Sequence, residues 1–286
     1  MIDKLVEPLY YTFMQRSLLI AILVGLLCSI VGSYLMVQRL ALLGDAISHA
    51  VMPGLAIAFS LEVPIIIGAL FAGVLSTILI SWICNNFPIK EDTAIGIVFA
   101  SFFAFGIILI TSIQKNNKID LNHFLFGNIL GVTFEDVVIT SLICAIVLFS
   151  IILIYKELLF YTFDYLGANV IGLPVKQLNF FLMVLVALTI IASMKAVGVV
   201  LVLALLVIPS ACASLLVYKL HYIMTCASAI GIFSSITGMY ISYFFNLPSG
   251  PAIVIVASLI FSFVLLYYKV MEYYKEKFKL INQTSL

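Results

Sequence analysis

Two ionisable side chains stand inside an almost wholly apolar stretch of this chain. The segment LALLGDAISHAVMPGLAIAF, residues 40–59, holds Asp45 and His49 four residues apart, and Pro53 follows four residues later. Residues four apart lie on one face of a helix, with their Cβ atoms about 5–6 Å from each other. A carboxylate oxygen and an imidazole nitrogen that converge in this way form a ligand pair suited to Zn²⁺, Mn²⁺ or Fe²⁺.

Pro53 adds a third feature to the segment. It has no N–H, so it leaves the carbonyl of His49 without its helical partner and bends the helix. That carbonyl is one more oxygen for a cation or for its water. Four protein ligands make a closed structural zinc site, whereas two side chains and a carbonyl predict a site where an ion binds only briefly. The alternative is structural: Asp45 and His49 hydrogen-bond each other, or Asp45 caps a helix after Gly44.

The elements that hold these residues are expected to be membrane-spanning helices. Of the 286 residues, 64% are hydrophobic and 9% are charged, against about a quarter charged in soluble domains. Runs of about 20 apolar residues, enough for one helix to cross a bilayer, recur along the chain. We predict an all-α bundle, a single transmembrane domain over residues 1–286, with nine spans, or eight if the short second one does not cross. The spans are expected at 17–37, 45–60, 63–84, 93–112, 137–154, 177–194, 196–217, 222–245 and 249–267.

Other chemistry finds little support in the sequence. The five cysteines include no C-x-x-C pair, so packing is a better interpretation than disulfides or a thiolate metal site. The motifs H-E-x-x-H and G-x-S-x-G are absent, and a net charge of +1 without a basic patch gives no sign of nucleic-acid binding. Because a charge at membrane depth costs at least about 2.5 kcal/mol, Asp45 and His49 favour a transport pathway over an enzyme. Pro209, inside the 196–217 span, predicts a second helix kink.

Orientation follows from the basic residues near the span ends. The tail YKVMEYYKEKFK carries four lysines and is expected in the cytoplasm, and counting back through nine spans puts the N-terminus outside. Glu62 and His123 then lie outside, where they are candidates for attracting metal to the mouth of the pathway, although acidic loop residues are ordinarily only solvated. Glu91 and Asp92 begin a span on the cytoplasmic side, where they either help release or favour a helix N-terminus.

Residues 155–176, YKELLFYTFDYLGANVIGLPVK, are too polar to span a membrane and too patterned for a plain linker. Asp164 can cap a short helix, Ala168 lies one turn on, and Gly172–Leu173–Pro174 ends it. A short helix here that presents small and apolar residues is predicted to be a docking site for a partner protein. The alternative is an amphipathic turn lying on the lipid surface.

Three segments of the chain resemble the permease subunit of bacterial ABC importers for divalent metals, the zinc, manganese and iron-chelate group. They are LLGDAISHAVMPGLAIAF, FLFGNILGV (124–132) and VGVVLVLALLVIPSACASLL (197–216), and the similarity runs from about Phe13 to Tyr268. The resemblance implies metal contacts at Asp45 and His49. It also implies that Asp164–Gly172 is a coupling helix that inserts into an ATPase subunit, since DYLGANVIG keeps the Asp, Ala and Gly positions.

The resemblance further implies a homodimeric permease in the bacterial plasma (inner) membrane, with two ATPase subunits below and an extracytoplasmic metal-binding protein above. ATP hydrolysis would belong to the separate subunit, and the permease would hold no permanent cofactor. The cargo would be zinc, manganese or iron, with zinc or manganese favoured. A secondary transporter driven by an ion gradient is the competing prediction, but it would carry further carboxylates in its spans. A membrane metal sensor is a third.

Overall fold

Helices that follow the apolar segments make up most of the described chain. The computed structural model describes residues 7–114 and 129–284, with side chains for 7–113 and 129–273. Within these ranges nine stretches are long and apolar enough to cross a membrane, which confirms the predicted all-α bundle. They are α2 (Thr12–Val37), α3 (Leu42–Ala50) with α4 (Met52–Ser60), α5 (Ile65–Asn86), α6 (Glu91–Gln114), α8 (Phe134–Leu153), α11 (Val175–Val197), α12 (Val199–Leu216), α13 (Leu220–Phe245) and α14 (Ser249–Thr284). The shorter helices are η1 (Glu7–Tyr10), η2 (Ile129–Gly131), α9 (Tyr155–Phe163) and α10 (Tyr165–Val170).

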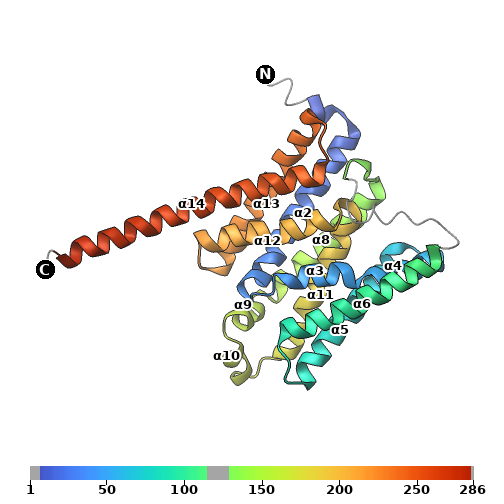
Figure 1. Ribbon diagram of the computed structural model, residues 1–286, viewed down its shortest axis with the longest axis horizontal. Coiled ribbons are helices and arrows are strands. Elements are labelled where there is room, and N and C mark those ends of the chain that lie inside the picture. Colours follow the sequence, from blue (N-terminus) through green and yellow to red (C-terminus); the bar gives the residue numbers. More distant parts are fainter. Residues whose placement is uncertain (1–6, 115–128, 285–286) are drawn as a thin grey trace.

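The spans form two groups that meet at α11. Helix α2 packs against α12 and α13, and α14 packs against the same two helices. Helices α3 and α4 lie against α5 and α6, while α11 contacts both α2 and α5 (Figure 1). The best-buried spans are α11, α2 and the second span made of α3 and α4, whereas the apolar side chains of α6, α8 and α14 are largely exposed. Exposed apolar side chains on long helices are suited to contact with lipid.

Close helix contacts hold the middle of the second span in place. A Cβ atom added to Gly54 of α4 would overlap the carbonyl oxygen of Gly68 in α5, and one added to Gly68 would overlap that of Gly54. A Cβ atom at Gly106 of α6 would lie 2.7 Å from the Cβ of Met52. Small residues allow backbones to approach in this way where helices pack inside a bilayer. Helices α5 and α6 therefore fix the position of the α3–α4 junction.

The second span is interrupted at Val51. Helix α3 ends at Ala50, and α4 begins at Met52 with Pro53 in its first turn. Pro53 supplies no N–H, so the His49 carbonyl lacks the partner that a continuous helix would give it. The Val51 N–H, which bonds Ile47 O, also points toward His49 O. The break thus lies where the sequence predicts it, but this carbonyl is less free than expected.

The segment between α8 and α11 folds as two short helices. Helix α10 is the predicted one: Asp164 Oδ1 accepts a hydrogen bond from Gly167 N at 2.8 Å, and Gly172 ends the turn at a φ of +85°. Helix α9 was not predicted. Ala168 is fully buried within the chain, so it does not form part of the exposed surface of α10, and the coupling role of this helix stays a prediction.

At the bundle end opposite α10, the start of α8 is tied to the end of α11. Thr133 and Asp136 form a reciprocal capping box at the N-terminus of α8. Asp136 Oδ1 also lies 2.6 Å from Lys195 Nζ of α11. Ser17 of α2 donates a hydrogen bond to Ile129 O of η2 at 2.8 Å. These contacts anchor the chain that follows the undescribed residues 115–128.

Helices α14 and α12 bear on the expected end of the last span and the expected bend at Pro209. Helix α14 continues well past Tyr267, to Thr284, and projects from the bundle (Figure 1). The residues beyond the apolar run are mostly good helix formers, so leaving the apolar window does not end the helix. Helix α12 runs without interruption through Pro209, and the kink expected there stays a prediction.

Candidate metal centre on the broken helix

Asp45 and His49 face each other on α3. Asp45 lies in the first turn of the helix and His49 in the last, and His49 Nε2 is 3.5 Å from Asp45 Oδ1. The Asp45 side chain is 50% exposed and that of His49 is 24% exposed. The predicted convergence of the two side chains is confirmed, and the pair is open to its surroundings.

The 3.5 Å separation bears on the two structural alternatives. It exceeds the ordinary range for an N–H···O hydrogen bond. With metal–ligand bonds of about 2.1 Å, two ligands of a tetrahedral metal would lie about 3.4 Å apart. Capping by Asp45 is excluded, because α3 begins at Leu42 with Ala41 as its N-cap residue and no side chain caps it. The separation lies within the range of an ion pair and also matches the spacing of two ligands of one cation, so the geometry is compatible with both.

Two phenylalanine rings of α6 pack against the imidazole of His49. The ring centroid of Phe103 lies 5.3 Å away in an edge-on arrangement, and that of Phe99 lies 5.7 Å away. The Nδ1 atom of His49 is buried and has no hydrogen-bond partner among the described residues. A metal could therefore reach the ring only through Nε2, the atom that faces Asp45.

The pair offers few ligands for a metal ion. No group of three or more His, Cys, Asp or Glu side chains in the described part of the chain is placed to hold a metal. A closed structural zinc site needs four protein ligands. A single described chain therefore offers at most a weak, open site at Asp45 and His49.

Among the described residues, Glu62 does not join Asp45 and His49 in a group that could hold a metal. Glu62 lies two residues after the end of α4, beyond the C-cap residue Leu61, and has a φ of +56°. It lies thirteen residues after His49, a separation of about 20 Å along a helical path. His123 lies outside the described residues.

Sequence reasoning missed a polar contact at the other end of α6. Asn179 of α11 donates from Nδ2 to Glu91 Oε1 at 3.2 Å. Burial raises the pKa of the nearby Tyr161 phenol, and the charge of Glu91 adds to this effect. Glu91 therefore does more than favour the N-terminus of α6: it joins α6 to α11 beside α9.

The exposed face of α10 consists of large apolar residues. Leu166 is 75% exposed, Val170 is 87% exposed and Ile171 is 69% exposed. Asp164 and Gly172 shape the helix ends, and Ala168 packs inward. The surface available to a partner is therefore made by side chains that the sequence analysis did not single out.

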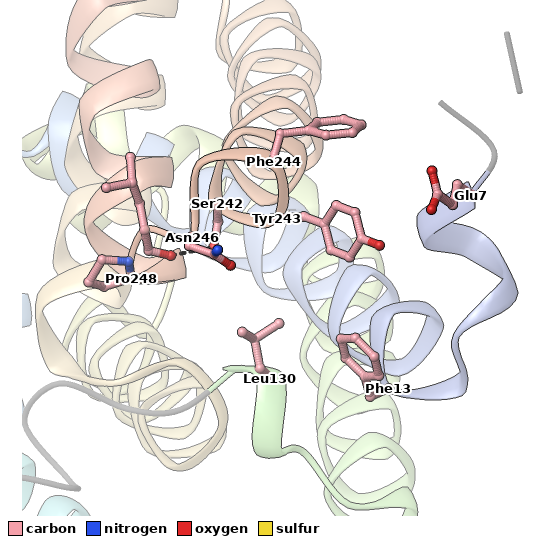
Figure 2. A pocket seen from close by; sticks show the side chains of 9 residues that line it. Glu7, Phe13, Leu130, Ser242, Tyr243, Phe244, Asn246 and Pro248 are labelled. Atoms are coloured by element: carbon pink, nitrogen blue, oxygen red, sulfur yellow. Dashed lines mark hydrogen bonds between the residues drawn. The ribbon is translucent and has the colours of Figure 1, made fainter. Parts of the chain in front are cut away.

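An open cavity of about 790 Å³ is lined by neither Asp45 nor His49. It is formed by η1, the start of α2, η2 and the α13–α14 turn. Its lining includes Glu7, Phe13, Tyr243 and Asn246 (Figure 2). One carboxylate and no histidine or cysteine line it, so it does not provide a second ligand pair of the Asp45–His49 type.

Comparison with known proteins identifies the chain. Residues 10–268 match the ABC 3 transport family. The chain belongs to this family. The prediction of an ABC importer permease is thereby confirmed, and a secondary transporter is disfavoured.

Individual relatives of this permease cover nearly its whole length. It is 57% identical over 89% of its length to an uncharacterized membrane protein of Cyanophora paradoxa, of which the match covers 85%. It is 42% identical over 90% of its length to the manganese transport system membrane protein MntC of Halalkalibacterium halodurans, covering 87% of that protein. A solved structure, PsaBC from Streptococcus pneumoniae in complex with Fab, is 40% identical and superposes with a TM-score of 0.81 over 92% of this permease and 95% of that chain.

Proposed function

We propose that this permease moves Mn²⁺ across the membrane and that the ion contacts Asp45 and His49 on its way. The observation that carries the proposal is the 3.5 Å approach of Asp45 Oδ1 to His49 Nε2 on an interrupted membrane helix. Family membership supplies the transport context. The charge of Asp45 offsets part of the hydration that the cation loses at membrane depth.

Manganese is proposed ahead of zinc and iron. One oxygen and one nitrogen donor fit all three ions, and the affinity order alone would favour zinc. A relative that is 42% identical is named for manganese transport. Two side-chain ligands are also too few to select an ion by high affinity. The ion that is delivered to the mouth of the pathway therefore determines which ion is transported.

The proposed orientation places α10 and the C-terminus in the cytoplasm and Glu62 outside. The basic residues support it: nine of the 14 Lys and Arg fall on the α10 side, four of them in the tail. Glu62 and His123 then lie on the side from which metal arrives and would raise its local concentration. The membrane would be the bacterial plasma membrane, and residues 1–286 would act as one transmembrane domain.

A separate ATPase subunit is proposed to drive transport by binding α10. The apolar face of Leu166, Val170 and Ile171 would seat in that subunit, with Asp164 and Gly172 holding the shape of the helix. A homodimer would bring two Asp45–His49 pairs to one path and pair with two ATPase copies. An extracytoplasmic metal-binding protein would deliver the ion, and the permease itself would keep no permanent cofactor.

Uptake of radioactive Mn²⁺, divided by the amount of inserted permease, tests the proposal. Asp45→Asn keeps the shape and removes the charge, and His49→Ala removes the nitrogen donor. Each is expected to cut uptake at least tenfold while insertion stays normal. Glu272→Gln, which neutralises an exposed carboxylate on the projecting part of α14, is the matched control and should transport normally. Near-normal uptake by both site variants would refute the metal contact, and loss of inserted protein with normal flux per molecule would restore the structural interpretation.

A further inference from the structure

The surroundings of His49 differ from those expected of a tightly bound metal ligand. A histidine that binds a metal through one ring nitrogen almost always donates the other N–H to a carboxylate, a carbonyl or water. In this permease Nδ1 of His49 is buried without such a partner. The rings of Phe99 and Phe103, which stack on each other at 5.8 Å, lie against the imidazole.

We propose that Phe99 and Phe103 are positioning residues that keep the metal site weak by denying Nδ1 of His49 an acceptor. The inference rests on the proposed function of Asp45 and His49. A metal on Nε2 leaves the ring proton on Nδ1, because a neutral imidazole carries only one. That N–H would be buried without an acceptor in a ring packed against Phe99 and Phe103, which is unfavourable. In the metal-free protein the proton can instead sit on Nε2, beside Asp45 Oδ1, so the cost arises on metal binding. Metal binding is opposed by this cost, and release is favoured by the same amount.

The packing of α6 shows why the two rings hold their place. Gly106 seats α6 directly on Met52 and Pro53 at the break in the second span. Glu91 at the other end of α6 is bonded to Asn179 of α11. Phe99 and Phe103 lie between these two contacts, so α6 is held against α4 on one side of the two rings and against α11 on the other.

Supplying an acceptor at position 103 tests this inference. Phe103→Gln offers a side-chain oxygen to Nδ1, whereas Phe103→Leu removes the ring without offering one. Gln and Leu should both be tolerated at these positions, because the side chains of Phe99 and Phe103 are only partly buried. Outer hydrogen bonds of this kind change metal affinity about 10–100-fold. Phe103→Gln is therefore expected to bind Mn²⁺ at least tenfold more tightly, with a lower KM and a lower maximal rate, and Phe103→Leu should bind within about threefold of the native protein.

The measurements are Mn²⁺ titration of the purified full-length permease in lipid nanodiscs and Mn²⁺ uptake kinetics in cells. If the Gln and Leu variants show the same affinity and the same KM, the inference is wrong. If Phe103→Gln does not insert into the membrane, Phe99→Gln replaces it and is compared with Phe99→Leu. The same affinity and the same KM in those two variants would likewise show that the inference is wrong.

Asp45→Asn separates this inference from the proposed function. Normal uptake by Asp45→Asn would overturn the metal pathway itself. Loss of uptake by Asp45→Asn together with identical Gln and Leu variants would leave the pathway standing and overturn only the role of the two rings. Combining Phe103→Gln with His49→Ala should abolish the gain in affinity, and a gain that survives in the double variant would also count against the inference.

Discussion

Val170 gives a quantitative test of the docking role of α10. Its side chain is 87% exposed in the isolated chain, so nearly all of its apolar surface remains to be buried by a partner. Full burial of a valine stabilises a complex by about 1.5–3 kcal/mol. Replacing Val170 with Ser removes most of that contribution without introducing a charge. We expect the affinity for the ATPase subunit to fall about 10–100-fold, since about 1.4 kcal/mol corresponds to a factor of ten.

The assay is titration of immobilised permease in nanodiscs with the purified ATPase subunit. Ile89→Ser serves as the matched control, because Ile89 is an exposed apolar residue of the α5–α6 turn on the same proposed side of the membrane. It should bind as the native permease does. Equal affinities for the native, Val170→Ser and Ile89→Ser proteins would refute the docking role and return α10 to the alternative of a turn on the lipid surface.

Three further predictions concern the ends of the helices. Gly172 has a φ of +85° and open space around it. Gly172→Ala should therefore weaken ATPase binding through about 1–2 kcal/mol of backbone strain, and Gly172→Asn should weaken it less. Equal effects of the two variants in the binding titration would exclude strain as the cause. Lys195→Met removes a partly exposed ion pair and should lower the unfolding free energy by about 0.5–1 kcal/mol. Asp136→Ala should lower it by about 1 kcal/mol more, because the capping box is lost as well. Denaturant titration in detergent measures both losses, and equal losses in the two variants would contradict the capping contribution. In a cysteine-free background, a thiol at Leu61 should react with an impermeant reagent from outside and one at Tyr218 should not; the reverse pattern would overturn the proposed orientation.

The span architecture was predictable from the sequence because a bilayer imposes it. Every span must supply about 20 apolar residues, and charged or Pro and Gly-rich segments separate those runs. The convergence of Asp45 and His49 was predictable for a similar reason, since the i, i+4 spacing fixes it within one helix. The interruption at Val51 followed from Pro53. In each case a local rule decides the outcome.

Contacts between helices could not be predicted in the same way. The approach of Phe99 and Phe103 to His49 depends on how α6 is seated against the second span, and the Gly106 contact that sets it has no signature in the sequence of either helix. The burial of Ala168 likewise depends on how α10 lies against its neighbours. Its composition suggested an exposed small residue, whereas the structure exposes Val170 and Ile171 instead.

The proposal of manganese also does not follow from the residues themselves. Asp45 and His49 provide one hard oxygen and one borderline nitrogen, which accept several divalent ions, and the affinity order pointed toward zinc. The choice of manganese comes from relatives. An open site with two side-chain ligands does not select an ion strongly by itself. On the proposed mechanism, selectivity between ions therefore comes from the ion that is delivered to the permease.

The most direct measurement of the central claim is pulsed electron paramagnetic resonance of Mn²⁺ bound to the purified permease in nanodiscs. A histidine nitrogen bonded to Mn²⁺ produces a nitrogen modulation of the echo signal. The native protein should show this modulation, His49→Gln should lack it, and His221→Gln, which changes an exposed histidine at the start of α13, should retain it. A modulation that persists unchanged in His49→Gln would contradict the assignment of His49 as a metal ligand.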